Sequence, residues 1–427
     1  MGTQQQDIRE LSVKHSRLET LVNHVNYETL SAEHRRQANG KAVGVDKVTR
    51  EAYGENLKEN LEDLLRRMKR FSYRPQPVRR VYIPKANGKE RPLGIPSYED
   101  KLVQGVMANI LKEVYEPRFL DCSYGFRPNR GAHDAIKRVN DLIMFKKVNY
   151  ILDCDIKGFF DNVDHAWLMK FLEHDIADKN FLRYIVRFLK AGVMEQNQYE
   201  KTSVGTPQGG LISPVLANVY LHYVLDIWFE KSVRRQLEGE AYLVRYADDF
   251  IIMTEHEEDA KAAYEALQER LAKFGLELAE DKTRILSFGR NSKTKATFDF
   301  LGFLHVNGKT RNGQYTVGHL VSRKKKGLFK ANLKKWVKDN RNVEFSGFMG
   351  KLDRKLRGIN NYYSVSGAIR EVRRLYLHAF WVVYKWMNRR SQRRSFTFEK
   401  FTAVWEEKIK KPHIHVNIWG RGGVVYN

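Results

Sequence analysis

The stretch LVRYADDFIIM, residues 243–253, decides the fold that the sequence predicts. Apolar residues, many of them β-branched or aromatic, flank Tyr246-Ala247-Asp248-Asp249 on both sides, which predicts a strand, a tight turn and a second strand. Two adjacent carboxylates at a hairpin tip repel each other unless a cation offsets the repulsion. The pair therefore indicates a site for an oxygen-preferring ion such as Mg²⁺, with an ordinary polar turn as the alternative reading.

A second acidic segment, YILDCDIKGFFD, occupies residues 150–161. Alternation of side chains puts Asp153 and Asp155 on one face of the strand that it predicts. If this strand pairs beside the hairpin, one of its carboxylates meets Asp248 around shared ions. Three carboxylates that hold two Mg²⁺ suit in-line phosphoryl transfer, because one ion activates the attacking hydroxyl and the other neutralises the departing pyrophosphate.

These two segments resemble the palm motifs of reverse transcriptases, and specifically of those encoded by group II introns. The resemblance implies an α+β right-hand polymerase with fingers, a palm that carries an antiparallel sheet, and a helical thumb. It also implies that Asp155, Asp248 and Asp249 are the catalytic carboxylates and metal ligands, with Ile156 as a further member of the metal site.

An aromatic side chain follows the first metal-binding Asp of that family by five residues. Asp155 and Phe160 have this spacing, so Asp153 is the weaker candidate. Phe160 is bulky and is expected to stack where a ribose 2′-hydroxyl would lie, which favours deoxynucleotides. Viral RNA polymerases, the nearest alternative polymerases, need a polar residue there that accepts the hydroxyl.

Residues 79–83 and 91–95 read as two strands around the turn Ala86-Asn87-Gly88-Lys89. This hairpin carries Lys85 on one arm and Arg91 on the other. An ammonium and a forked guanidinium together suit a triphosphate, and the fingers of the family hold the nucleotide in this way. A solvated basic hairpin is the alternative.

The segment GTPQGGLISPVLANVY occupies residues 205–220. Its glycines permit a close backbone approach to a ligand, and Ser213-Pro214 is a helix start. The helix is expected to run to about Leu237. In the family, the Pro-Gln-Gly triplet lies against the incoming nucleotide and the template base, which makes Gln208 a candidate nucleotide-binding residue.

Further candidates rest on shorter matches. Lys282 matches a family lysine that protonates the leaving pyrophosphate, although a lone lysine on a strand edge is more often solvated. FDFLGF at residues 298–303 resembles the turn that grips the primer, and Gly302 permits a close backbone approach. Arg127 and Arg130, in SYGFRPNR, either contact template phosphates or pair with acidic residues of the fold, and the sequence does not separate these alternatives.

Positive charge is concentrated near the C-terminus. Of the net charge of +24, residues 321–427 carry +19, from 26 Lys and Arg against 7 Asp and Glu. Aromatic residues are interleaved with these charges, which favours a nucleic-acid surface over a solvated basic face. Arg323, Lys324 and Lys325 are the candidate contacts, and LRGINNYY at 356–363 resembles the signature of the family's thumb, or maturase, domain.

Several classes are disfavoured. The chain has no apolar run of transmembrane length and no signal peptide, and Gln6 stands where a myristoylation site has Ser or Thr. The two cysteines, Cys122 and Cys154, are too few for a disulfide framework and fit a reducing cytoplasm. His413 and His415 lack partner cysteines, so the zinc endonuclease domain of the family is expected to be missing.

The sequence thus predicts an extension at 1–70, fingers and palm at 71–315, a helical thumb at 316–395 and a basic tail at 396–427. The predicted function is RNA-directed DNA polymerisation with two Mg²⁺, an RNA template, a DNA or RNA primer and dNTPs, together with binding of structured intron RNA and no membrane partner. The alternatives are an RNA-binding splicing factor with secondary polymerase activity, and a domesticated relative that serves phage defence or repair.

Overall fold

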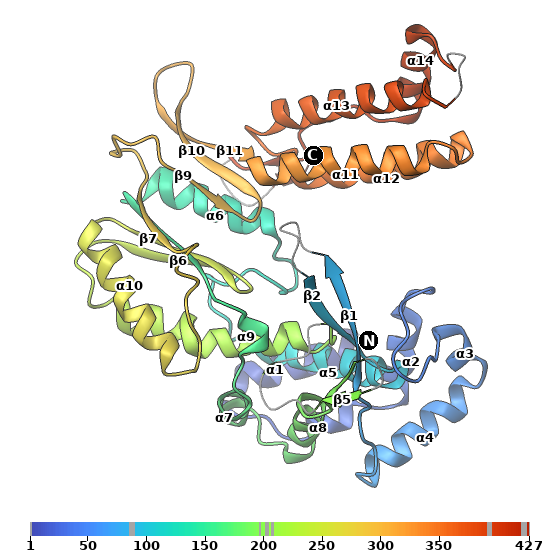
Figure 1. The fold of residues 1–427 in the computed structure, drawn as a ribbon. Helices are drawn as coiled ribbons and strands as arrows, with labels where there is room; N and C mark the ends of the chain where they lie inside the picture. Colours follow the sequence, from blue (N-terminus) through green and yellow to red (C-terminus); the bar gives the residue numbers. More distant parts are fainter. Residues whose placement is uncertain are drawn as a thin grey trace.

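The computed structural model describes residues 2–84, 90–195, 198–200, 205, 209–390, 395–419 and 425–426. Helices and sheets alternate along the chain, so the predicted α+β class is confirmed. In Figure 1 the N-terminal helices lie below the β1–β2 hairpin, and the long C-terminal helices lie above it.

The helical elements fall into an N-terminal group, a middle group and a C-terminal group. They are α1 Gly2–Lys14, η1 Leu21–His24, α2 Tyr27–Arg36, α3 Arg50–Glu55, α4 Leu57–Lys69, α5 Tyr98–Tyr115, α6 Ala132–Phe145, η2 Phe159–Asp161, α7 His165–Asp175, α8 Lys179–Leu189, α9 Ser213–Leu221, η3 His222–Asp226, η4 Phe229–Val233, α10 Glu257–Ala272, α11 Arg323–Asn340, α12 Phe345–Tyr363, α13 Ile369–Met387 and α14 Phe398–Lys408.

The strands form separate sheets. They are β1 Val78–Pro84, β2 Glu90–Ile95, β3 Tyr150–Asp155, β4 Val193–Glu195, β5 Gln198–Glu200, β6 Ala241–Tyr246, β7 Asp249–Thr254, β8 Arg284–Ser287, β9 Thr297–Phe300, β10 Phe303–Lys309, β11 Tyr315–Val321, β12 Val416–Asn417 and β13 Val425–Tyr426. The strand orders are β6-β7-β3-β8, β2-β1-β4-β5, β11-β10-β9 and β12-β13.

The β6-β7-β3-β8 sheet is antiparallel and separates two hydrophobic clusters. Because side chains alternate along a strand, Leu152 and Ile252 enter the first cluster, whereas Ile151 and Ile251 enter the second. Burial on both faces explains why these strands read as nearly continuous apolar runs, interrupted by acidic residues at one end of the sheet.

The helix predicted to run from Ser213 to about Leu237 changes its winding after α9. Residues 222–226 and 229–233 are π-helical turns, η3 and η4. Such turns inside a helix are often associated with functional sites, because they displace side chains from the regular helical register.

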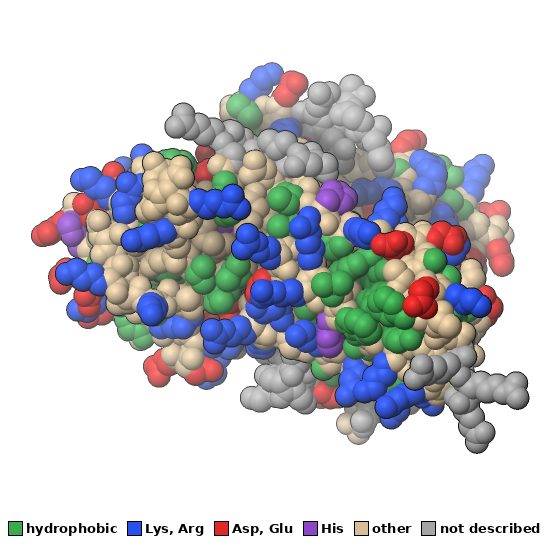
Figure 2. Space-filling model, turned by 90° about the horizontal axis from the view of Figure 1, so that it is seen from above, with side chains coloured by type: hydrophobic (Ala, Val, Ile, Leu, Met, Phe, Trp, Pro, Cys, Tyr) green, Lys and Arg blue, Asp and Glu red, His purple; other side chains and the backbone are tan. Residues whose placement is uncertain are grey.

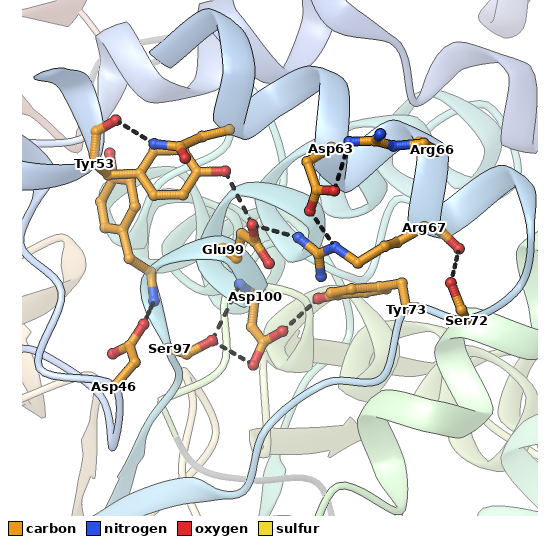
Figure 3. A network of polar contacts seen from close by, with 12 residues as sticks. Asp46, Tyr53, Asp63, Arg66, Arg67, Ser72, Tyr73, Ser97, Glu99 and Asp100 are labelled. Carbon is orange, nitrogen blue, oxygen red and sulfur yellow. Dashed lines mark hydrogen bonds and ion pairs between the residues drawn. The ribbon is translucent and has the colours of Figure 1, made fainter. Parts of the chain in front are cut away.

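Polar contacts fasten the N-terminal helices to α5 (Figure 3). Arg67 of α4 bonds to Asp63 at 2.6 Å and to Glu99 at 2.7 Å, and the hydroxyl of Tyr53 donates to Glu99 at 3.2 Å. The buried carboxylate of Asp100 accepts from Ser97 at 2.6 Å. Residues 27–69 therefore form an integral layer of the fold, in which residues 37–49 connect α2 to α3.

The segment that the sequence suggested as a basic tail is part of a helical bundle. Phe401 and Trp405 of α14 are buried in a third cluster with Val383 of α13 and Leu352 of α12. The expectation of a separate tail after residue 396 was therefore wrong, because its aromatic residues complete this core. The helical region begins at Arg323 and not at 316, since β11 extends to Val321. In the part of the chain that the structure describes, no helix combines the length and the apolarity needed to cross a bilayer.

Candidate active site

The hairpin predicted at residues 243–253 is present, and its turn is tight. Tyr246 pairs with Asp249 in the β6–β7 register, so Ala247 and Asp248 form a two-residue loop. Ala247 has φ of 57°, in the left-handed region that residues with a Cβ seldom adopt. This backbone puts the two adjacent carboxylates at the end of the sheet.

Asp155, the last residue of β3, lies directly opposite Asp249 in the antiparallel β3–β7 register. The predicted convergence of the two acidic segments is thus present in the fold. Asp153 lies opposite Arg284 of β8, and the Arg284 Nε lies 3.4 Å from Asp153 Oδ2. Asp153 therefore pairs with Arg284, and Asp155 is the residue of β3 that lies opposite Asp249 of the hairpin.

The crowding of carboxylates raises their pKa values. Burial, followed by repulsion from Asp153, Asp248 and Asp155, raises the pKa of Asp249 to about 7. Burial is also the largest cause that raises the pKa of Asp248, with Asp155 adding to it, and burial raises that of Asp153 to about 6. Negative charge at this end of the sheet is held at a free-energy cost that a nearby cation would relieve.

Lys282 supplies positive charge beside this cluster. Its Nζ makes an ion pair with Asp155 Oδ2, and this hydrogen bond is the main cause that raises the pKa of Lys282. The backbone positions the pair, because Ala279 N donates to the carbonyl oxygen of Asp155 at 2.8 Å, and the buried Ile156 forms a bridge with Leu278. The structure thus brings Lys282 and Ile156 to the predicted site.

The chemistry of this donor set fits a divalent cation. The side chains of Asp155, Asp248 and Asp249 offer carboxylate oxygens, the ligands that Mg²⁺ prefers, and their mutual repulsion disfavours an arrangement without a cation. Within the described residues, no three His, Cys, Asp or Glu side chains already form a group that could hold a metal ion.

The β1–β2 hairpin approaches the carboxylates from the other side. Burial raises the pKa of Asp248, and Arg91 of β2 lies near enough to that carboxyl for its positive charge to offset part of the rise. A Cβ on Gly209 would come within 2.5 Å of the carbonyl oxygen of Gly94, so the glycine-rich segment packs tightly on β2. The two other nucleotide-binding predictions, Lys85 and Gln208, lie outside the described residues.

Phe160 lies in η2, five residues after Asp155, and is partly buried against the first cluster. Its ring contacts that of Phe159, with centroids 5.3 Å apart. A Cβ on Gly205 would lie 3.1 Å from the carbonyl oxygen of Phe160. The glycine-rich segment therefore starts against η2 and reaches β2 at Gly209, which links the predicted sugar-contacting and phosphate-binding elements.

The Gly302 turn and the start of α11 lie beside Asp249. Burial raises the pKa of Asp249, and a backbone hydrogen bond from Leu301 offsets part of that rise. Gly302 has φ of 80°, and a Cβ there would lie 2.8 Å from the hydroxyl of Tyr363 and 3.5 Å from Cε of Lys325. Arg323, Lys324 and Lys325 are exposed on the first turn of α11. The predicted primer-gripping turn and basic helix therefore meet at the carboxylate cluster.

The sequence left two roles open for Arg127 and Arg130, contact with template phosphates or pairing within the fold. In the structure, both guanidinium groups pair with acidic residues of the fold. Arg127 is buried and bonds to Glu116, with Nε to Oε2 at 3.0 Å and Nη2 to Oε1 at 2.9 Å. Arg130 Nη2 lies 2.7 Å from Asp121 Oδ1. Of the two alternatives, these bonds support pairing within the fold for Arg127, because its guanidinium group is already bonded inside the protein.

A comparison with protein families decides the classification. The model of the reverse transcriptase (RNA-dependent DNA polymerase) family matches residues 83–305, more than half of the 427-residue chain. The chain belongs to the reverse transcriptase family. The matched region contains β2–β9, which include the acidic β6–β7 hairpin and its neighbouring strand β3.

Relatives of this reverse transcriptase include intron-encoded proteins, so the resemblance to the group II intron type is confirmed. The group II intron-encoded protein LtrA of Lactococcus lactis is 47% identical over 165 residues, which are 38% of this chain and 27% of LtrA. Protein YkfC of Escherichia coli is 32% identical over 323 residues, 68% of this chain and 82% of YkfC. An uncharacterized 91 kDa protein in the cob intron of Schizosaccharomyces pombe is 40% identical over 170 residues, 40% of this chain and 21% of that protein.

Sequence reasoning missed one residue of this reverse transcriptase that supports the hairpin tip. Arg245 is fully buried on the face of β6 opposite to the carboxylates. A charged residue at an inward position of an otherwise apolar strand was the available signal, because such a residue is seldom buried unless it is paired.

Proposed function

We propose that this chain is an RNA-directed DNA polymerase of the group II intron type, built as a right hand. The β1–β2 hairpin belongs to the fingers, the β6-β7-β3-β8 sheet to the palm, and α11–α14 to the thumb. One observation carries the proposal: Asp155 and Asp249 face each other across β3 and β7, with Asp248 at the tip between a basic hairpin and a basic helix.

The residues of the site divide between three tasks. Asp155, Asp248 and Asp249 would hold two Mg²⁺, which supply positive charge at the attacking and leaving oxygens. Arg91 of the fingers would bind the triphosphate together with Lys85, which the sequence puts on the other arm of the same hairpin. Lys282, whose ammonium stays protonated through its contact with Asp155, is the candidate proton donor to the leaving pyrophosphate.

The template and primer would lie against the Gly302 turn and α11. The groove between α11 and α12 supports this orientation, because a cavity of about 300 Å³ there is lined by Lys325, Lys355 and Trp336 together with apolar side chains. Charge and aromatic surface together are typical of nucleic-acid contacts. We propose that Phe160 faces the sugar of the incoming dNTP and that Gln208 lies near the nascent base pair.

The experiment that tests this function is primer extension by the full chain on a poly(rA) template with an oligo(dT) primer, dTTP and Mg²⁺. We expect labelled primer to lengthen, and we expect ATP on a poly(dT) template to give no product. Absence of dTTP incorporation, with the primer–template complex formed and Mg²⁺ present, would refute polymerase activity.

Binding of structured intron RNA is the second function that we propose, for the face of the thumb away from the fingers. Figure 2 views the molecule from above and shows a hydrophobic patch that Lys and Arg side chains border on some sides and Asp and Glu side chains on others, with many more Lys and Arg elsewhere on this face. On α13 and α14, Leu377, Trp381 and Phe398 are 55%, 54% and 44% exposed, and the rings of Trp381 and Phe398 are stacked. The intron-related names of several relatives support RNA as the partner. The two free cysteines fit a cytoplasmic location.

Neutralising the first turn of α11 is expected to weaken nucleic-acid binding. In the triple variant Arg323→Gln, Lys324→Gln, Lys325→Gln, the slope of log affinity against log salt should fall by about 2 to 3, because each phosphate contact contributes roughly 0.7 to 0.9. Fluorescence anisotropy of a labelled RNA–DNA duplex at several salt concentrations measures this slope.

The matched control places the same charge change on α4, in Lys58→Gln, Lys69→Gln and the adjoining Arg70→Gln, which are exposed residues. We expect this control to keep the wild-type slope. Equal slopes of log affinity against log salt for the two triple variants would show that the first turn of α11 is not part of the nucleic-acid-binding surface.

A further inference from the structure

Arg245 lies inside the protein, two residues before the turn that carries Asp248. Its side chain is fully buried, and all five guanidinium N–H donors have acceptors. Nε and Nη2 bond to the two carboxylate oxygens of Asp226, at 2.7 and 2.5 Å, and Nη2 also donates to Ser123 Oγ at 2.8 Å. Nη1 donates to Asn218 Oδ1 and to the carbonyl oxygen of Ala247, both at 3.0 Å.

These bonds tie the hairpin to two other parts of the chain, the continuous helix formed by α9 and η3 and the connection before α6. Asn218 lies on α9, Asp226 ends the π-helical turn η3, and Ser123 lies in the connection before α6. The backbone of this connection also pairs with Arg245, because Arg245 N donates to Cys122 O at 2.8 Å and Tyr124 N donates to Arg245 O at 2.9 Å. Arg245 is therefore the point at which the sheet, α9 and this connection are joined.

The same network confines the turn itself. Ala247 adopts a left-handed conformation that favours glycine, and its carbonyl oxygen is held by Arg245. Gly125 packs so closely that a Cβ there would lie 2.4 Å from Ala247 N, and Asn218 Nδ2 holds the carbonyl oxygen of Gly125 at 2.6 Å. The peptide units before Asp248 are thus fixed on both sides.

We propose that Arg245 is a positioning residue for the polymerase reaction, which acts through the Ala247 carbonyl to fix the direction in which Asp248 projects. The inference rests on the proposed polymerase function. A buried ion pair contributes little net stability compared with apolar side chains of similar volume, so stability alone does not account for this one. Lysine at 245 would keep the charge but would lose the fork that reaches several acceptors at once.

The variant Arg245→Lys is expected to lower kcat for dTTP incorporation about 100-fold, since small misplacements of reacting groups have effects of that size. KM for dTTP and the Kd for primer–template should stay close to those of the wild type, because neither ligand touches Arg245. In a readout independent of turnover, the affinity of the protein–primer–template complex for Mn²⁺, followed by EPR, should also fall.

A matched control separates positioning from loss of a buried ion pair in general. Arg118 pairs with the buried Asp175 and also bonds to backbone carbonyls of the segment after α1. Arg118→Lys therefore removes a comparable fork whose acceptors lie on α7, on α1 and in the segment after it, rather than on the β6–β7 hairpin. It should lower Tm and leave kcat and Mn²⁺ affinity unchanged.

The double variant Arg245→Met, Asp226→Leu removes both buried charges together, so it should recover Tm relative to Arg245→Lys while kcat stays low. Return of kcat together with Tm would show that Arg245 is only structural and would overturn the proposal.

If this variant does not fold, Ser123→Ala removes a single acceptor of Arg245. A lowered kcat at wild-type Tm supports the proposal, and an unchanged kcat overturns it. An inactive wild type would instead refute the proposed function.

Discussion

Replacement of Asp248 by Asn is expected to abolish primer extension, with a fall in kcat of about 1000-fold or more, equivalent to roughly 4 kcal/mol in the activation free energy. The substitution keeps the size of the side chain, but it removes its negative charge and replaces one acceptor oxygen with an NH2 donor at the hairpin tip. Nucleic-acid affinity should remain nearly intact, since the basic surface on α11 is unchanged. Single-nucleotide incorporation on poly(rA) and anisotropy with the same duplex measure the two quantities.

The control is Glu265→Gln, an isosteric loss of one negative charge on the exposed face of α10. This variant should extend primers as the wild type does. Extension by Asp248→Asn at a rate similar to the control would refute the assignment of the carboxylate cluster as the catalytic centre.

Shortening Phe160 to Val is expected to relax the choice of sugar. The ring lies in η2 beside the segment that starts at Gly205, and it is only partly buried, so its removal opens space next to the proposed nucleotide site. The ratio of kcat/KM for dATP to that for ATP, measured on poly(dT) or poly(rU), should fall by about 10- to 100-fold, the range that shape alone provides in a binding pocket.

Phe171→Val provides the comparison, because Phe171 is also a partly buried aromatic residue on the first cluster but lies on α7 among other rings. It should lower stability without altering the ratio of dATP to ATP use. An unchanged ratio in Phe160→Val would count against Phe160 as the residue that selects the sugar.

The features that sequence predicted well depend on local signals. The hairpin at Asp248 and Asp249 follows from a turn between two apolar runs, and alternation along β3 separates Asp153 and Asp155 from the residues of the other face. Lys282 was a candidate on a single match to a family motif. The structure places it beside Asp155, because the short connection after α10 returns the chain beside β3.

The features that sequence missed depend on distant partners. Nothing local to Arg127 indicates that Glu116 of the segment after α5 will fill its fork, and nothing around Phe401 indicates a place in a core with α12 and α13. Arg245 needed acceptors from the helix formed by α9 and η3 and from the connection before α6 before its burial was tolerable. Such contacts are decided by tertiary packing, which a motif or a periodicity does not encode.

The return of Val416 and Ile418 to the second hydrophobic cluster has a consequence for how the molecule is made. That cluster also contains Ile151 and Ile251, from the strands that carry the catalytic carboxylates, and Val416 forms a bridge with Val365. A ribosome releases α6 and the strands long before it releases Val416, so α6 can cover part of this face early, whereas the part that Val416 and Ile418 complete must wait for late-synthesised residues. During that interval the nascent polypeptide exposes apolar surface, and a chaperone that shields it would protect the newborn chain from aggregation.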